Sequence, residues 1–315
     1  MRPPFLSILP ALSKVSDLYI KAEQAPADTL NGWSLADRDP RVIEQLMPWW
    51  EWLYHYYFRV TTDGWEHVSR TEKALYVGSH NGGMAAPDMF MMMTDWFWRF
   101  GTERPMYGLM HPKVWQVMPI LARMAVQGGA LRAHPRTAIA ALRSGASVLV
   151  YPGGIQDVFR PYPLRHDIHF NGRQGFIKLA LREEVPIVPA ISCGAHETLI
   201  VLTDIYPQVQ AVRQQFGLPW LLGIDPEVCP IYLGMPWGIA VGPLPHIPFP
   251  TSIHTRVCPA IVFDRYGPDA AKDEDYVNDC YEQVRSLMQT ALDKLVKELM
   301  KPTKMNLSTP NLSTF

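Results

Sequence analysis

The chain has 315 residues, of which 48% are apolar, so it is long enough to bury a large core. Its 29 basic and 30 acidic residues leave a net charge of −1, so no nucleic-acid partner is expected. The cysteines lie far apart and form no C-x-x-C pair, which argues against a zinc site and a secreted disulfide framework; they are Cys193, Cys229, Cys258 and Cys280.

The first 60 residues are expected to form a leader followed by an amphipathic helical arm. Residues 1–40 contain several prolines and are predicted to be irregular. Their uninterrupted apolar runs are too short for a signal peptide, so export is not expected. Residues 38–60, RDPRVIEQLMPWWEWLYHYYFRV, have the pattern of a helix that Pro48 would kink.

Residues 61–300 are predicted to form a single α/β domain. Strands are expected at 73–79, 128–133, 146–152 and 185–192, and helices at 87–100, 111–126, 135–145, 172–184 and 273–300. Strands that alternate with helices indicate a mostly parallel central sheet flanked by helices on both faces, here followed by a long C-terminal helix. The Ser/Thr/Asn-rich residues 301–315 are predicted to be disordered.

Three segments are unusually rich in apolar side chains. Residues 44–58 and 89–100 concentrate Trp, Tyr, Phe and Met, which favours core packing, with docking at a lipid–water interface as the alternative. Residues 216–249 carry only Asp225 and Glu227 as acidic or basic residues, and their prolines exclude one long helix. Buried strands and a membrane-facing flap are both consistent with this last pattern.

The stretch YVGSHNGGMAAPDMF, residues 76–90, places His80 directly after a predicted strand. Ligands of open α/β sheets lie beyond the carboxyl ends of the strands, so His80 is a candidate catalytic base. Asp88 follows eight residues later, a distance of roughly 26 Å if the chain were extended. Gly82 and Gly83 allow the tight turn that would bring the two side chains together. A structural histidine is the alternative.

The stretch YPGGIQDVFRP, residues 151–161, follows another predicted strand. Gly153 and Gly154 can present backbone amides to an anion or an oxyanion, and Arg160 adds a positive charge nearby. An ordinary tight turn is the alternative. Upstream, Arg132 belongs to a group of basic residues that could bind a phosphate or the phosphopantetheine of an acyl carrier, or could form a solvated face.

Other motifs are absent or weak. The sequence has no GxSxG, GxxxxGK[ST], GxGxxG or HExxH motif, which removes the usual reasons to expect a serine hydrolase, a nucleotide or zinc. His166 and His169 have no third ligand in sight, so no metal site is expected. His196 and Glu197 follow the strand at 185–192, where structural roles are favoured; Glu197 and Asp157 are the alternatives to Asp88 as the partner of His80.

The order of these segments resembles the glycerolipid acyltransferase superfamily, also called lysophospholipid acyltransferase-like. A histidine motif after a strand is followed by GG-L-R, by YPGG and by VPIVPAI at 185–191. The sequence is most similar to the branch that includes monoacylglycerol and diacylglycerol acyltransferase-like proteins and the acyltransferase part of plant phytyl ester synthases. The resemblance covers about residues 38–261, and it implies that residues 61–300 are an acyltransferase domain.

The resemblance also implies a reaction and roles for the site residues. In the superfamily a His followed by four residues and an Asp activates the acceptor hydroxyl; His80 matches this His, whereas Ala85 stands at the Asp position. The donor would be an acyl thioester of coenzyme A or of an acyl-carrier protein, which is a substrate, so no cofactor is expected. Gly153 and Gly154 would stabilise the oxyanion, and Arg160 and Arg132 would hold the phosphate end of the donor.

One departure bears on the acceptor. Phospholipid-making members have a glutamate where this chain has Gly153, which together with the apolar segments favours a neutral acceptor such as diacylglycerol or a prenyl-type alcohol. A lysophospholipid acyltransferase, an acyl-thioester hydrolase and a non-catalytic lipid-binding protein are the alternatives. A lipid acceptor implies a protein that associates peripherally with a membrane surface, expected on its cytoplasmic side.

Overall fold

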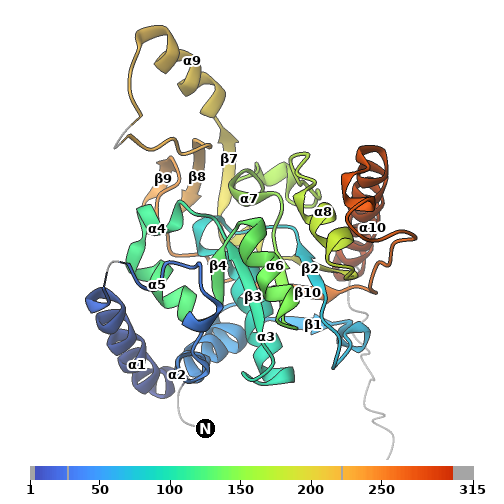
Figure 1. The fold of residues 1–315 in the computed structure, drawn as a ribbon. Coiled ribbons are helices and arrows are strands. Elements are labelled where there is room, and N and C mark those ends of the chain that lie inside the picture. The colour runs from blue at the N-terminus through green and yellow to red at the C-terminus, as the bar shows by residue number, and fades with distance from the viewer. Residues whose placement is uncertain (1–3, 27, 221–222, 301–315) are drawn as a thin grey trace, which may run out of the picture.

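A seven-stranded sheet forms the centre of the molecule (Figure 1). The computed structural model describes residues 4–26, 28–220 and 223–300. The strands are β1 (Thr61–Asp63), β2 (Leu75–Gly78), β3 (Met106–Met110), β4 (Ala130–Arg132), β5 (Ser147–Val150), β6 (Ile187–Cys193) and β10 (His254–Val257). Their order is β1-β10-β6-β2-β5-β3-β4, and every neighbouring pair is parallel except β10 and β6. The mostly parallel sheet is thus confirmed.

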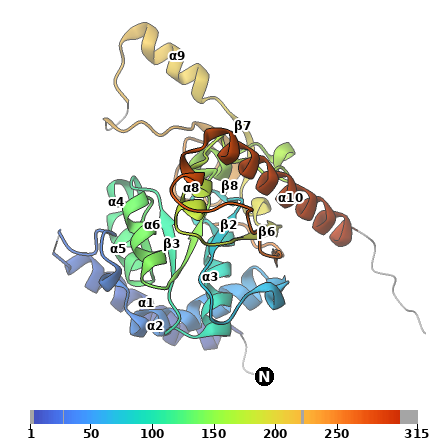
Figure 2. The ribbon, with the colours of Figure 1, turned by 45° about the vertical axis from the view of Figure 1, so that its right-hand side comes forward.

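Helices cover both faces of this sheet (Figures 1 and 2). One face carries α1 (Pro4–Gln24), α2 (Pro40–Trp52), α3 (Pro87–Phe100) and α5 (Pro119–Gln127); the other carries α6 (Pro135–Arg143), α8 (Gly175–Arg182) and α10 (Glu274–Met300). Successive side chains of a strand point to opposite faces. Leu75 and Val77 of β2 therefore pack among the second group of helices, whereas Tyr76 packs among the first. The expected α/β class is confirmed.

Most predicted elements inside the domain are present. The four predicted strands correspond to β2, β4, β5 and β6, and the helices predicted at 87–100, 135–145, 172–184 and 273–300 correspond to α3, α6, α8 and α10. Their ends differ from the predictions by three residues or fewer. The elements that the sequence did not predict include β1, β3 and β10. The sequence missed them because they depend on pairing with distant segments. For example, β10 lies between β1 and β6.

The prediction of an irregular leader over residues 1–40 was wrong for residues 4–24, which form α1. Pro10 lies inside this helix and removes one backbone hydrogen bond. The helix nevertheless buries Leu18 and Ala22 in the same apolar cluster as Trp96 of α3. Packing of its apolar face offsets the loss at the proline, because helices in proteins owe most of their stability to tertiary contacts.

The single helix predicted over residues 111–126 is two helices, which corrects that prediction. Residues Val114–Val117 form the short helix α4, and α5 begins at Pro119. Between them Met118 has φ −136° and ψ 63°, outside the helical region. The cause is local, because a proline disfavours the helical conformation of the residue before it.

The helical arm expected at 38–60 is present as α2, with Pro48 inside it, followed by a π-helical turn at Leu53–Tyr57. Ile43 and Leu46 of α2 share an apolar cluster with side chains of the sheet. The domain boundary near residue 60 stays a prediction. The predicted disorder of residues 301–315 lies outside the described residues.

A smaller antiparallel sheet projects from the main body (Figures 1 and 2). It consists of β7 (Ile200–Asp204), β8 (Pro230–Gly234) and β9 (Gly238–Val241), with α9 (Tyr206–Phe216) between β7 and β8. We call residues 200–249 the flap. Part of the apolar segment 216–249 thus forms strands, but Tyr232 and Ala240 are buried on one face while Leu233 and Ile239 are exposed on the other.

Among the described residues, no helix has both the length and the apolar character that crossing a membrane requires.

The burial of α1 predicts a measurable effect on stability. Leu18 is 2% exposed, so Leu18→Ala should lower the free energy of unfolding by about 2–5 kcal/mol in a denaturant titration. Leu12→Ala, on the exposed side of the same helix, is the control and should change it by about 0.5 kcal/mol or less. Equal effects of the two substitutions would show that α1 does not pack as described.

Candidate active site

His80 lies two residues beyond the carboxyl end of β2, the central strand of the sheet. The strands on either side of β2 are β5 and β6, and both run parallel to it. Their carboxyl ends therefore meet at the same edge of the sheet, where open α/β proteins bind their ligands. The sequence placed His80 at this edge, and the structure agrees.

The chain after His80 turns back on itself through residues with positive φ. Gly82 has φ 80°, Gly83 has φ 62° and Ala86 has φ 43°, so three residues of one short loop are in the left-handed region. Gly82 is also sterically required, since a Cβ there would lie 2.5 Å from Oγ1 of Thr198. This loop accommodates the residues between His80 and Asp88, so that the two side chains can meet.

Asp88 and His80 are brought together by that turn. Nδ1 of His80 donates to the Asp88 carboxylate at 3.2 Å. The same carboxylate accepts from the amide of Asn81 at 2.7 Å and from the amide of Met89 at 2.8 Å. The Asp88 side chain is fully buried, whereas that of His80 is 17% exposed and lines a cavity. With Nδ1 bound to Asp88, Nε2 is the ring nitrogen that remains for a substrate.

Tyr151 supports the imidazole from behind, a contact that sequence reasoning missed. Its ring stacks on that of His80 with centroids 4.5 Å apart. The register of β2 and β5 pairs Val77 with Val150, which places Gly78 next to Tyr151. A Cβ on Gly78 would lie 2.2 Å from the tyrosine ring, so the glycine makes room for it. Burial, with a smaller contribution from Asp88, raises the pKa of the Tyr151 hydroxyl well above 10.

Arg160 is not positioned to hold a donor phosphate, which corrects that prediction. It is 4% exposed and forms a buried ion pair with Asp157. Its guanidinium also donates to the carbonyl of His80 at 3.1 Å and to Oδ1 of Asn81 at 2.6 Å. Asp157 in turn accepts from the amide of His80 at 2.6 Å. The pair therefore fixes the backbone of the His80 loop, and Asp157 is not the partner of the imidazole.

His196 and Glu197 likewise have supporting positions. Nε2 of His196 donates to the carbonyl of Arg160 at 2.9 Å, and Glu197 lies 3.4 Å from the guanidinium of Arg165. Burial, reinforced by the Arg160 charge, lowers the pKa of His196 to about 3, so its ring is neutral near pH 7. Asp88, and not Glu197, is therefore the partner of His80.

The paired glycines after β5 form a turn into α7 (Gly154–Val158). A Cβ on Gly153 would lie 2.3 Å from the carbonyl of His169. The amide of Gly154 donates to the carbonyl of Tyr151 at 3.2 Å, so it is already engaged. Gly154 lines the cavity, but its amide is not free for an oxyanion; a role for the Gly153 amide stays a prediction.

Arg132 is also engaged elsewhere, which corrects the expectation that it holds the donor. Its Nε donates to the carbonyl of Asn31 at 2.7 Å. Its guanidinium lies 4.4 Å from the ring centroid of Trp115 and 5.7 Å from that of Trp33. These contacts join the segment before α2 to β4 and leave Arg132 off the cavity lining.

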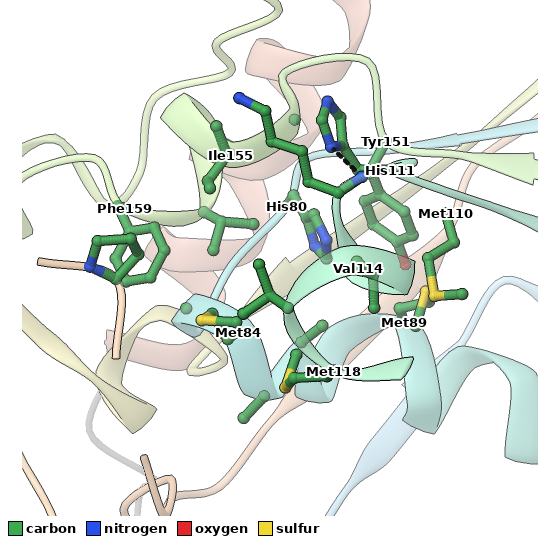
Figure 3. Close-up of a pocket in the computed structure, with 18 of the residues that line it drawn as sticks. His80, Met84, Met89, Met110, His111, Val114, Met118, Tyr151, Ile155 and Phe159 are labelled. Atoms are coloured by element: carbon green, nitrogen blue, oxygen red, sulfur yellow. Dashed lines mark hydrogen bonds between the residues drawn. The ribbon is translucent and has the colours of Figure 1, made fainter. Parts of the chain in front are cut away.

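A cavity of about 1750 Å³ opens beside His80. Figure 3 shows His80 facing a space bordered by Met84, Val114 and Met118. The lining extends from Val15 of α1 to Trp220 beyond α9, elements that lie at opposite ends of the molecule in Figures 1 and 2. Most of the lining is apolar, and among the described residues that form it there is no Asp or Glu.

In the described part of the chain, no three His, Cys, Asp or Glu side chains are grouped so that they could hold a metal ion.

Sequence comparisons relate this chain to known proteins. Residues 45–220, more than half of the chain, match a family model described as "Diacylglycerol acyltransferase". Uncharacterized proteins of Mycobacterium tuberculosis and Mycobacterium bovis are each 27% identical over 240 residues, which is 76% of this chain and 62% of theirs. One from Mycobacterium leprae is 25% identical over 251 residues, or 80% of this chain and 64% of its own. The chain thus spans less than two thirds of these relatives.

Among solved structures, the 1-acyl-sn-glycerophosphate acyltransferase PlsC from Thermotoga maritima aligns with 96% of this chain and 100% of its own. The TM-score of that alignment is 0.44 and the sequence identity is 12%.

The buried His196 predicts a pH dependence of stability. Its pKa is lower in the folded protein than its ordinary value of about 6.5, so its contribution is complete above pH 6.5 and is lost as the pH falls toward about 3. His196→Gln should flatten the decline of the unfolding free energy over this interval, by up to about 1.4 kcal/mol per pH unit. Urea titrations at several pH values would measure it. The same substitution at the exposed His67 should leave the decline unchanged.

Proposed function

Because the chain belongs to the diacylglycerol acyltransferase family, we propose that it is an O-acyltransferase that moves a fatty acyl group from an acyl thioester to the hydroxyl of a neutral lipid. The observation that carries the proposal is the pair of His80 and Asp88 beside a cavity of about 1750 Å³. A base held in one orientation next to a large apolar space suits the chemistry of a lipid alcohol.

The reaction follows from the geometry of the imidazole. Nε2 of His80 takes the proton of the acceptor hydroxyl while Asp88 holds Nδ1–H and stabilises the imidazolium. The alcohol oxygen attacks the thioester carbonyl, a carbon–oxygen bond forms, and the carbon–sulfur bond then breaks. The proton held by His80 passes to the departing thiolate. No covalent acyl-enzyme is needed, because both substrates meet at the same ring nitrogen.

The cavity favours two apolar substrates. Its volume of about 1750 Å³ exceeds the roughly 300–1,000 Å³ that is usual for one small ligand, so an acyl chain and a lipid acceptor fit at the same time. The side chains around His80 on the cavity side include Met84, Val114 and Met118, which offer an acceptor no charge (Figure 3). A neutral alcohol, such as diacylglycerol or a prenyl-type alcohol, loses little on entering such a space.

Turnover with different acceptors tests the proposal. Purified protein supplied with labelled long-chain acyl-CoA should esterify a neutral lipid alcohol faster than lysophosphatidate. His80→Ala should lower the rate by about 10²-fold or more, the usual scale for loss of a general base, with an unchanged circular dichroism spectrum. His67→Ala, at an exposed site, is the control.

Other outcomes would replace the proposal with a specific alternative. Turnover restricted to lysophosphatidate would identify a lysophospholipid acyltransferase. Release of free fatty acid at the same rate with and without an alcohol would identify a thioester hydrolase. Lipid binding without turnover of any donor would identify a non-catalytic lipid-binding protein.

We also propose that the flap contacts a membrane surface. Ile200, Leu233 and Ile239 are neighbours across its three strands on the face that points away from the core. Ile239 is 72% exposed, and Trp237 in the turn before it is 54% exposed. A sheet with one solvated face normally alternates apolar and polar side chains, whereas here both faces are apolar. The exposed Val241 also lines the cavity, so a lipid could pass from the flap into it.

Vesicle binding tests this contact. The double substitution Trp237→Ser and Ile239→Ser should reduce co-sedimentation with phosphatidylcholine vesicles by about 10-fold or more, because it removes two large apolar side chains from the interface. Val262→Ser, at a residue that is 66% exposed outside the flap, should not reduce it. If the flap variant binds vesicles normally but loses a concentration-dependent dimer in size-exclusion chromatography, the face joins two copies of the chain.

A further inference from the structure

Three basic side chains, those of His111, Lys113 and Arg173, line one part of the cavity rim. Lys113 donates its amide to Nδ1 of His111 at 3.2 Å, a contact drawn in Figure 3. Burial lowers the pKa of His111; Glu227 opposes this change, while the charges of Lys113 and Arg173 add to it. Arg173 lines the same cavity as His111 and Lys113, although it lies 62 positions beyond His111 in the sequence.

Arg173 differs from Arg160 because its hydrogen bonds go to neutral oxygens and it has no carboxylate partner among the described residues. Its Nη1 donates to the carbonyl of Gly153 at 2.7 Å and to that of Pro152 at 3.1 Å, and Nη2 donates to Oε1 of Gln156 at 3.3 Å. The residue is exposed, and the described lining of the cavity contains no carboxylate. Its charge is thus available to an anion that enters the cavity.

Lys113 is the second cation at this rim, and its partner lies outside the lining. Its ammonium group forms an ion pair with Glu227 of the flap and donates to the carbonyl of Asp225 at 2.6 Å. Both members of the ion pair are partly exposed, so the pair is weak enough to exchange for a more highly charged anion. A phosphate between Arg173 and Lys113 would receive donors from two different elements.

We propose that Arg173 and Lys113 bind the phosphate of the carrier arm of the acyl donor, an inference that rests on the proposed function. A thioester whose carbonyl is at His80 has an apolar chain on one side and a polar, phosphorylated arm on the other. The chain fits the apolar cavity, whereas the arm must leave through a polar part of its lining. Arg173 marks such an exit close to the base: its Nη1 lies against Gly154, whose amide bonds to Tyr151, and the ring of Tyr151 stacks on His80.

The test compares a donor that has the phosphate with one that lacks it. Arg173→Gln and Lys113→Gln should each lower kcat/KM for long-chain acyl-CoA by about 10-fold or more, mainly through KM. The same variants should use the acyl thioester of N-acetylcysteamine, which has no phosphate, as well as the wild type does. Arg182→Gln, at the other end of the helix that follows Arg173, is the matched control and should leave both donors unaffected.

Four results would overturn the inference. An equal loss with both donors would show a structural role, and a loss seen only with lysophosphatidate as acceptor would assign the rim to an acceptor phosphate. Binding of coenzyme A alone, measured by calorimetry, needs no turnover and separates this inference from the proposed function. Wild-type affinity for coenzyme A in both variants, or no affinity in the wild type, would remove the site even if acyl transfer is observed.

Discussion

A fully buried carboxylate must find hydrogen-bond donors, and the candidate site of this protein is arranged around that need at Asp88. Its oxygens accept from the imidazole of His80, from the amide of Asn81 and from the amide of Met89. One side chain thereby joins the end of β2, the following loop and the start of α3. The contact with the buried Asp88 carboxylate thus orients the imidazole. The left-handed conformation of the loop allows this contact to form.

The loop is also held from the opposite side by a second buried charge. Asp157 accepts from the amide of His80, and Arg160 donates to the carbonyl of the same residue. The neutral ring of His196 in turn donates a hydrogen bond to the carbonyl of Arg160. Burying an ion pair stabilises a fold only when its remaining hydrogen bonds are satisfied, and these contacts supply them. The candidate base is consequently held in place by an ion pair and by hydrogen bonds to its backbone.

The sequence predicted the features that depend on local pattern and failed on those that depend on distant partners. The position of His80 after a strand followed from apolar runs. The two glycines allowed the fold-back to Asp88, while Asp157 and Glu197 stayed open as alternative partners. In contrast, the sequence does not distinguish Arg160 from Arg173. Only the structure shows that Arg160 forms an ion pair with the buried Asp157. The helix α1 was missed for a similar reason. The local sequence contains the proline that disfavours a helix, whereas the residues that pack against the helix lie elsewhere in the chain.

The cavity connects two distant parts of the molecule. Its lining reaches α1 at one end and the flap at the other, with the reacting nitrogen between them. Under the proposed function, different parts of the polypeptide would set the length limits of the two lipid tails. Substitutions near Val15 would then change the space for one tail, and substitutions near Trp220 would change the space for the other. Such a division would let the preference for one substrate change without a change in the preference for the other.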